Sequence, residues 1–441
     1  MSWRRHNDDI LLKGHITMHR YLIATTALVL PLSAMAAPAP TDPYLARVDK
    51  VLAATPLIDG HNDWAEALVD HAGDKRWTID LNKLDTKDYD TDIARLRQGR
   101  MGGQFWSVFV SPALPGLEQV KATLEQIDLV NQIVRRYPQT FQLAMTAADV
   151  RAAHKAGKIA SMIGVEGGGQ IDKSFSVLRA YKRLGAGYLT LTHAVTIDWA
   201  DSATDDPKHD GLTKYGEAVV HELNRIGMLV DLSHVSEATM LDALTVTKAP
   251  VIFSHSSAKA ICNHSRNVSD AVLKKVAANG GIVMVNFAPN YISEARRVWG
   301  AARGAEQARY NTPPFGGLYI GDPVKAKAAL AEWEKANPEP KVTMSDVADH
   351  IDHIAKVAGV DHVGLGGDYD GLPALPEGMD GVESYPRLLA ELMRRGWSDA
   401  DIAKLAGGNI LRVMEAAEKV AASMRNEPAA TETIAQLDST K

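Results

Sequence analysis

Two residues with metal-binding side chains stand close together near residue 60. An apolar run ends at Gly60, and His61 and Asp63 follow with one residue between them. On a strand, residues two apart point to the same side, so an imidazole nitrogen and a carboxylate oxygen would lie at close range. Such a pair suits a metal ion. The alternative is a turn in which Asp63 caps the next helix and His61 is merely adjacent.

Histidine and acidic residues also follow several other apolar runs. These runs are β-branched or apolar throughout, as strands buried on both faces are. The residues at the ends of the runs, in chain order, are His61 with Asp63, Glu166, His193, His234, His255, and Asp368 with Asp370. Charged side chains gathered at one end of a sheet must be paired or must bind metal. Six such strand ends therefore favour a functional site over isolated structural residues.

Five of these residues, His61, Asp63, Glu166, His234 and His255, supply three imidazoles and two carboxylates. That is more than one tetrahedral zinc ion with an open position can use. The set fits two metal ions about 3.5–4 Å apart that share one carboxylate.

Other polar residues have simpler interpretations. His350 and His353 lie three residues apart on an expected helix, but aspartates beside both of them favour a solvated face. The glycines 167–169 could cradle a phosphate, but no Lys-Ser/Thr follows them, so a permissive turn is favoured. The Gly-x-Ser-x-Gly pattern of many serine hydrolases is absent from the sequence.

Eight apolar runs alternate with amphipathic stretches, which predicts a (β/α)8 TIM barrel. The expected strands are 55–60, 104–110, 159–165, 188–192, 228–232, 250–254, 281–286 and 362–366. The expected helices between them are 117–137, 174–184, 214–226, 236–247, 269–278 and 345–358. The active site of such a barrel lies at the carboxyl ends of its strands, where the residues above fall.

Some segments fall outside this repeat. Residues 64–103 form an excursion after the first strand. Residues 289–342 are interpreted as a partly helical insertion after strand seven that could cover the site. Further helices are expected at 384–395, 398–406 and 409–420. We expect residues 37–423 to form a single domain and residues 424–441 to form a flexible tail.

The composition is that of a globular protein with a large core. Of 441 residues, 46% are hydrophobic and 23% are charged, which is long and apolar enough to bury such a core. The net charge of −6 and the lack of a long basic run argue against nucleic acid as a partner.

Residues 1–36 have the pattern of a secretory signal peptide: a basic residue, an apolar stretch at 21–32 and a small-residue site before Ala37. Met18 is an alternative start, and an uncleaved membrane anchor is the competing interpretation. Cys262 is the only cysteine, so we expect no internal disulfide, and the polar C-terminal end lacks the hydrophobic tail of a GPI signal. We therefore expect a periplasmic or secreted protein without a stable membrane anchor.

Six motifs occur in order between about residues 50 and 415. They are IDGHNDW, GVEGG, LTHA with a following WAD, DLSHVS, VIFSHSSAKAICNHSRNV and HVGLGGDYDG. Together they resemble the membrane dipeptidases, also called renal dipeptidases, a family of zinc peptidases among the amidohydrolase-like barrels. Many related barrels have His-x-His where this chain has His-x-Asp, which makes the resemblance specific.

The resemblance implies a role for each matching residue. His61 and Asp63 correspond to ligands of a first zinc ion, and Glu166 corresponds to the carboxylate that bridges both ions. His234 and His255 correspond to ligands of the second zinc ion.

It also implies the residues that act on the substrate. His193 resembles the histidine near the oxygen of the scissile carbonyl. Arg266 resembles the arginine that holds the C-terminal carboxylate. Asp368 resembles the acid–base residue, although spacing alone leaves Asp370 as its rival.

The expected protein is thus an exported dinuclear zinc dipeptidase. The resemblance implies that a hydroxide between the zinc ions attacks the scissile carbonyl, while Asp368 passes its proton to the leaving amine. Members of the family often accept a C-terminal D-residue and are commonly homodimers. This chain lacks the paired cysteines and the GPI tail of the mammalian members, which puts surface anchoring and a disulfide-linked dimer in doubt.

Two other functions compete with this one. Hydrolysis of a cyclic amide, lactam or ester would need no carboxylate clamp, so Arg266 discriminates against it. A zinc-binding or solute-binding periplasmic protein would need neither the free carboxylate of Asp368 nor an open metal position.

Overall fold

The structure is a computed structural model that describes residues 42–439, so the expected signal peptide lies outside the described residues. The strands are β1 (Leu57–Asn62), β2 (Met101–Phe109), β3 (Phe141–Leu143), β4 (Ile159–Glu166), β5 (Ala186–Thr190), β6 (Leu229–Asp231), β7 (Ile252–Phe253), β8 (Ile282–Val285) and β9 (Val363–Leu365). The helices before the seventh barrel strand are α1 (Pro43–Ala54), α2 (Trp64–Ala67), α3 (Ile93–Gln98), α4 (Gly116–Arg136), α5 (Ala147–Lys155), α6 (Phe175–Arg183), α7 (Lys214–Ile226), α8 (Glu237–Val246) and α9 (Asp270–Asn279). Those after it are α10 (Pro289–Ile292), α11 (Glu294–Tyr310), α12 (Pro323–Ala336), α13 (Met344–Ala358), α14 (Tyr385–Arg394), α15 (Asp399–Ala403), α16 (Asn409–Ser423) and α17 (Ile434–Leu437).

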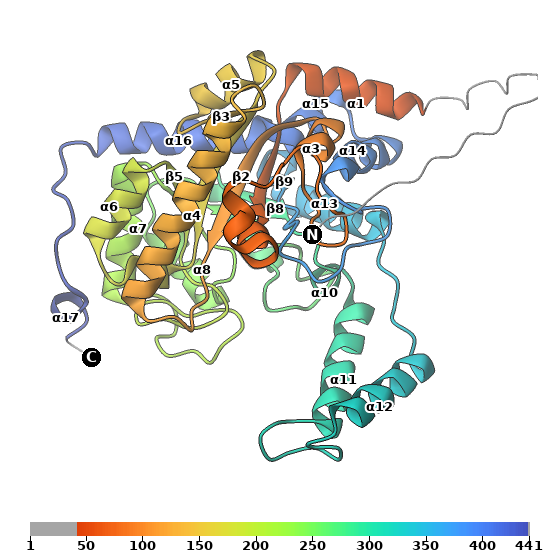
Figure 1. Cartoon of the computed structure of the whole chain (residues 1–441). Helices are drawn as coiled ribbons and strands as arrows, with labels where there is room; N and C mark the ends of the chain where they lie inside the picture. The colour runs from red at the N-terminus through yellow and green to blue at the C-terminus, as the bar shows by residue number, and fades with distance from the viewer. Residues whose placement is uncertain (1–41, 440–441) are drawn as a thin grey trace, which may run out of the picture. The chain divides into compact units, whose positions relative to one another are not determined.

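Eight of these strands form a closed parallel barrel surrounded by helices (Figure 1). Neighbouring strands follow the order β2-β1-β9-β8-β7-β6-β5-β4, and β2 pairs with β4 to close the ring. The remaining strand, β3, pairs with the first residues of β4. From Ile163 onward, β4 pairs with β5 instead. The predicted (β/α)8 barrel is confirmed.

The elements form where local chemistry favours them. Every residue of β1 and β4 is buried, as expected for parallel strands covered on both faces, which explains the largely apolar sequence of β4 and the apolar start of β1. Hydroxyl side chains cap the helices that follow the barrel loops: Ser174, Ser236 and Ser269 each accept a hydrogen bond from a backbone N–H of the first turn. These caps end the loops at fixed positions, and the loops carry most of the site.

The insertion after the seventh barrel strand, β8, contains a two-helix hairpin of α11 and α12 (Figure 1). No residue of α11 is buried, and Ala326 is the only buried residue of α12. The start of the insertion, including Tyr291 and Arg296, lines the cavity described below. Among the described residues, its contribution to the site therefore comes from this first part.

The segment after α16, expected to be flexible, makes specific contacts as far as it is described. Met424 is buried, Arg179 Nη1 donates to Ala430 O at 2.9 Å, and Tyr215 N donates to Asp438 Oδ1 at 3.1 Å. These contacts connect it to α6 and α7. The proposed domain boundary at residue 423 and the flexibility of the tail stay predictions.

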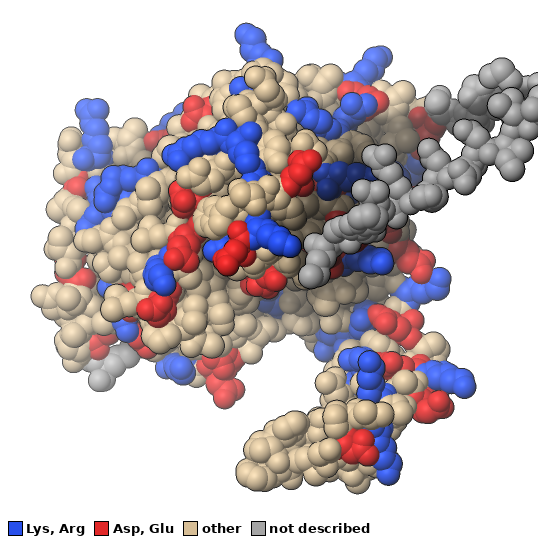
Figure 2. Space-filling model, viewed as in Figure 1, with Lys and Arg blue, Asp and Glu red and all other residues tan. Residues whose placement is uncertain are grey.

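The described surface is mixed in charge. On the face shown in Figure 2, Lys and Arg side chains alternate with Asp and Glu side chains. Within residues 42–439, none of the helices combines the length and hydropathy needed to cross a membrane.

Candidate metal centre

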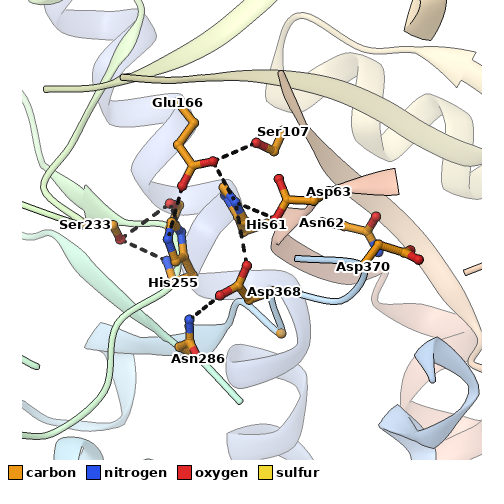
Figure 3. Close-up of polar contacts among 12 residues, drawn as sticks. His61, Asn62, Asp63, Ser107, Glu166, Ser233, His255, Asn286, Asp368 and Asp370 are labelled. Atoms are coloured by element: carbon orange, nitrogen blue, oxygen red, sulfur yellow. Dashed lines mark hydrogen bonds and ion pairs between the residues drawn. The ribbon is translucent and has the colours of Figure 1, made fainter. Parts of the chain in front are cut away.

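Glu166 lies at the centre of a group of metal-binding side chains at the carboxyl end of the barrel (Figure 3). It is the last residue of β4 and is buried. Its Oε2 lies 3.4 Å from His61 Nε2, whereas its Oε1 lies 3.0 Å from His234 Nε2 and 3.4 Å from His255 Nε2. The two carboxylate oxygens therefore face different histidines.

Asp63 and Asp368 complete the side of the group that contains His61. Asp63 Oδ2 lies 3.4 Å from His61 Nε2, and Asp368 Oδ1 lies 3.9 Å from the same nitrogen. His61 and Asp63 stand at the end of β1, and Asp368 follows β9, which pairs with β1. Residues from opposite ends of the chain meet here because their strands are neighbours.

The spacing of these atoms fits a metal ion. Two ligand atoms bound to one tetrahedral zinc ion lie roughly 3.3 Å apart, and the distances above from Glu166 and Asp63 to the histidines are 3.0–3.4 Å. His61 Nε2 and Asp63 Oδ1 are buried without a hydrogen-bond partner in the described part of the chain. Such atoms are costly unless a ligand satisfies them. The residues present therefore fit a metal centre.

Tyr188 on β5 orients His61. Its hydroxyl donates to Gly60 O at 3.3 Å and lies 2.8 Å from His61 Nδ1. The phenol oxygen can then accept a hydrogen bond from Nδ1–H, which leaves the Nε2 lone pair facing Glu166. Gly164 makes room for Tyr188, because a Cβ at residue 164 would lie 1.9 Å from the ring.

A chain of hydrogen bonds orients His255. Its Nδ1 lies 2.8 Å from Ser254 Oγ, which donates to Asp231 Oδ2 at 2.6 Å. Thr190 Oγ1 donates to the same carboxylate oxygen at 2.6 Å, and the backbone N–H groups of Ser233 and Ser254 donate to Oδ1. Because Ser254 gives its proton to Asp231, its oxygen can accept from His255 Nδ1–H. With the proton on Nδ1, His255 Nε2, which lies 2.8 Å from His234 Nε2, can offer its lone pair to a metal.

Burial shifts the pKa values of His234, His255 and Asp368 towards their neutral forms. It lowers the pKa of His234 and His255 well below the ordinary value, and the positive charge of Arg266 acts in the same direction. Neutral imidazole is the form that binds metal. Burial also raises the pKa of Asp368 well above its ordinary value, and the negative charges of Asp63 and Glu166 contribute. A cation bound beside Asp368 would lower its pKa again.

The backbone around the site is held in uncommon conformations. His234 and Asp368 have φ values of 69° and 63°, in the left-handed region that non-glycine residues rarely adopt. Strain of this kind is concentrated at functional sites. Gly371 is required for a different reason: a Cβ there would lie 2.1 Å from Asp63 Oδ2 and 2.8 Å from Asp368 Oδ1.

A cavity of about 540 Å³ adjoins the metal-binding group. It is lined by residues of both the group and the neighbouring loops, including Asp63, Glu66, Phe109, Glu166, His193, His234, His255, Arg266, Tyr291, Arg296 and Asp368. His193 Nε2 lies 3.8 Å from Glu166 Oε1. Arg266 is buried, donates from Nη2 to His255 O at 3.3 Å, and has its guanidinium carbon 5.6 Å from the Tyr291 ring centre. The structure thus brings all the sequence-predicted site residues together.

The rival residue, Asp370, lies elsewhere. Its Oδ1 accepts a hydrogen bond from Asp90 N at 2.7 Å, and its own N–H donates to Asp90 Oδ2 at 3.0 Å. Figure 3 shows its side chain directed away from Glu166 and Asp368. Asp370 therefore connects the segment after β1, at Asp90, to the loop that contains Asp368.

The predicted solvated face at His350 is wrong. His350 is fully buried, its Nδ1 accepts from Ala258 N at 3.0 Å, and its Nε2 lies 2.8 Å from Ile292 O. His353 lies 2.7 Å from Asp270 instead. Helical spacing was interpreted correctly, but the loops that cover this face of α13 could not be inferred from it.

Sequence reasoning missed four residues that shape the site. Asn286 Nδ2 donates to Asp368 Oδ2 at 2.7 Å, and Asp231 holds Ser254 as described. Asn286 stands at the end of an expected strand and Asp231 one residue before the end of another, so their positions were a usable signal. Tyr291 and Glu66 line the cavity from the short helices α10 and α2, and nothing in their local sequence distinguishes them.

A closed parallel barrel with histidines and carboxylates gathered at the carboxyl ends of its strands is the arrangement expected of a TIM-barrel enzyme that binds metal. The model of the membrane dipeptidase family, Peptidase family M19, matches residues 45–428. The chain belongs to this family, and it is a metallo-dipeptidase that hydrolyses peptide bonds.

Three solved structures share the fold. The probable dipeptidase PvdM from Pseudomonas aeruginosa is 24% identical, with a TM-score of 0.73 over 86% of this chain and 99% of that one. A metallo peptidase from Rhodobacter sphaeroides, liganded with a phosphinate mimic of the dipeptide L-Ala-D-Ala, is 23% identical, with a TM-score of 0.67 over 82% and 99% of the two chains. Dipeptidase AC, a metallo peptidase, is 24% identical, with a TM-score of 0.65 over 82% and 98%.

Proposed function

We propose that this protein is an exported dipeptidase that uses two zinc ions, which His61, Asp63, Glu166, His234 and His255 would hold, with Glu166 as the ligand common to both. The observation that carries the proposal is that the two oxygens of Glu166 face His61 on one side and His234 and His255 on the other. Asp63 would complete the first ligand set. Each ion would then have nitrogen and oxygen ligands, which zinc accepts, and a position open to substrate.

When bound, the two zinc ions would supply a water activated at neutral pH and would polarise the scissile carbonyl. Asp368 would take a proton from the attacking water and deliver it to the leaving amine. Asn286 holds Asp368 Oδ2, so that Oδ1 faces His61. His193 lies beside Glu166 on the cavity wall and donates to the oxygen of the scissile carbonyl as negative charge develops there.

Arg266 binds the C-terminal carboxylate of the substrate. Its planar fork can form two parallel hydrogen bonds with a carboxylate. Because it also contacts the backbone of His255, the carboxylate site lies close to the metal ligands. This arrangement leaves space for one residue after the scissile bond, which favours dipeptides over longer chains. The phosphinate mimic of L-Ala-D-Ala in the Rhodobacter structure supports acceptance of a C-terminal D-residue here.

A zinc titration with dipeptide substrates tests this proposal. Metal-depleted protein should recover hydrolysis of L-Ala-L-Ala and L-Ala-D-Ala as zinc is added, with saturation at two ions per chain. Arg266→Lys should mainly raise KM for dipeptides and spare an N-acyl substrate that lacks the carboxylate. Saturation at one ion, or hydrolysis of lactams or esters without dipeptides, would contradict the proposal.

Export and assembly are part of the same proposal. The signal-like residues 1–36 support export to the periplasm or medium, and a mature N-terminus near Ala37 in protein purified from that fraction would agree with it. We propose a homodimer on the basis of family membership. Light scattering of the purified protein would test it by measuring the molecular mass.

A further inference from the structure

Glu66 places a carboxylate on the wall of the cavity one helical turn from a metal-binding residue. It belongs to α2, whose N-cap is Asp63. Residues three apart on a helix lie on the same face, and both side chains line the cavity. Glu66 therefore borders the part of the site that contains His61 and Asp63.

This carboxylate has no hydrogen bond or ion pair with any residue in the described part of the chain. Burial raises its pKa to about 8, the negative charges of Asp63, Glu166 and Asp70 contribute to the rise, and the charge of His61 opposes it. A partly buried carboxylate without a hydrogen bond or ion pair is stabilised when a positive charge lies beside it. The cavity beside Glu66 is open to ligand, so a ligand can supply that charge.

The positive and negative side chains that line the cavity follow different strands of the barrel. Arg266 follows β7 and contacts His255, in the half of the site that contains His234. Glu66 follows β1, and β9 and β8 lie between β1 and β7 in the ring. A positive and a negative side chain thus line one cavity from strands three positions apart in the ring, which suits a ligand with a carboxylate at one end and an amine at the other.

We propose that Glu66 binds a protonated amine on the amino-terminal residue of the dipeptide. The inference rests on the proposed function, because a C-terminal carboxylate on Arg266 and a carbonyl at the metal centre direct the amino-terminal residue towards α2. The amine can be the α-ammonium group or the ammonium of a lysine-like side chain. Both are the same chemistry for Glu66, and substrate analogues distinguish them.

Binding of two pairs of phosphinate dipeptide mimics to the zinc-loaded protein tests the proposal. One pair mimics Lys-Ala and norleucyl-Ala, which differ in the side-chain ammonium. The other mimics Ala-Ala with and without its α-amine. Calorimetry on wild type should show tighter binding of the amine-bearing member of at least one pair by about 10- to 100-fold. Glu66→Gln should bring that ratio close to one.

Asp70→Asn is the matched control, because Asp70 is exposed, lies one turn further along the chain and does not line the cavity. It should leave the ratio within about twofold of wild type. If Glu66→Gln loses the preference for the Lys-Ala mimic over the norleucyl-Ala mimic, Glu66 binds the side-chain ammonium. If it loses the preference for the Ala-Ala mimic that keeps its α-amine, Glu66 binds the α-ammonium. Ratios near one in wild type, ratios unchanged in Glu66→Gln, or an equal effect of Asp70→Asn would overturn the proposal. Turnover of the corresponding dipeptides, measured separately, tests the proposed function itself.

Discussion

At the scale of single residues, Glu166 is the carboxylate that faces both sets of candidate metal ligands. Its two oxygens face separate sets of histidines, and Ser107 Oγ donates to Oε2 at 3.0 Å. Glu166→Gln keeps the shape but replaces one acceptor oxygen with an NH₂ donor, which repels a cation. We expect bound zinc to fall from two ions per chain to one or none, measured by elemental analysis after dialysis.

Ser107→Ala provides the comparison for this variant. It removes one hydrogen bond to Glu166 but leaves both carboxylate oxygens in place, so the zinc content should stay close to that of the wild type. Two tightly bound zinc ions in Glu166→Gln would show that Glu166 is not a shared ligand.

Asp368 and Asn286 separate proton transfer from metal binding. Asp368→Asn cannot accept a proton, so kcat should fall by about 10²- to 10⁴-fold while zinc content is retained. Asn286→Ala releases Asp368 Oδ2 and should lower kcat less, because the carboxylate itself remains. Steady-state kinetics with parallel metal analysis checks both expectations. Full activity in Asp368→Asn would move the acid–base role to another residue.

The candidate metal ligands could be chosen from the sequence because each one lies at the end of an apolar run. His61, His234 and His255 could be recognised without knowing which strands are neighbours. Asn286 and Glu66 could not, because their importance depends on what faces them across the barrel or the cavity. Spacing alone could not separate Asp368 from Asp370, since both are aspartates in one short loop. The resemblance favoured Asp368, and the contacts of the two residues place Asp368 near His61 and Asp370 at Asp90.

At the scale of elements, Asp231 joins three consecutive strands where the barrel meets the site. It ends β6, accepts from Thr190 at the end of β5, and accepts from Ser254 directly after β7. Asp231→Asn turns one of these acceptors into a donor and breaks the chain of bonds to His255. We expect zinc affinity to weaken by about 10- to 100-fold, as is usual when the partner of a metal-binding histidine is lost. Competition with a chelator measures it.

Thr190→Val is the control for this effect. It removes one bond to Asp231 Oδ2 but leaves the bond from Ser254. Zinc affinity should then change much less than in Asp231→Asn, although both variants lose stability. Equal losses of affinity would mean that Asp231 acts only by holding the strands together.

The same residue explains where the predicted strands were too long. The sequence predicts strands at 228–232 and 250–254, but β6 and β7 are shorter. The backbone N–H groups of Ser233 and Ser254 bond to the Asp231 side chain rather than to a neighbouring strand. The apolar run continues past the last hydrogen bond between the paired strands, so hydrophobicity cannot show where the strand pairing ends. The three-residue β3 was missed because so short a run carries too little pattern.

At the scale of the whole molecule, His350 couples stability to pH. It joins α13 to the loop after β7 and to the end of α10, through Ala258 N and Ile292 O. Burial lowers its pKa to about 4, from 6.5. As the pH falls below 6.5, the unfolded chain binds a proton at this residue and the folded chain does not, until the pH approaches 4. The free energy of unfolding should therefore fall over this range, by up to about 3 kcal/mol from His350 alone.

Urea unfolding between pH 8 and pH 4 checks this expectation against His350→Gln. Glutamine keeps a hydrogen-bond donor and acceptor but does not titrate, so the variant should be less stable at pH 8 and lose less stability on acidification. The metal-binding histidines titrate in both proteins, and the difference between the two pH profiles therefore isolates His350. Parallel profiles would show that His350 is already protonated in the folded state or that its loops open before it titrates. A shallower profile for the variant would identify the contact between α13 and the loops after β7 and β8 as the pH-sensitive part of the fold.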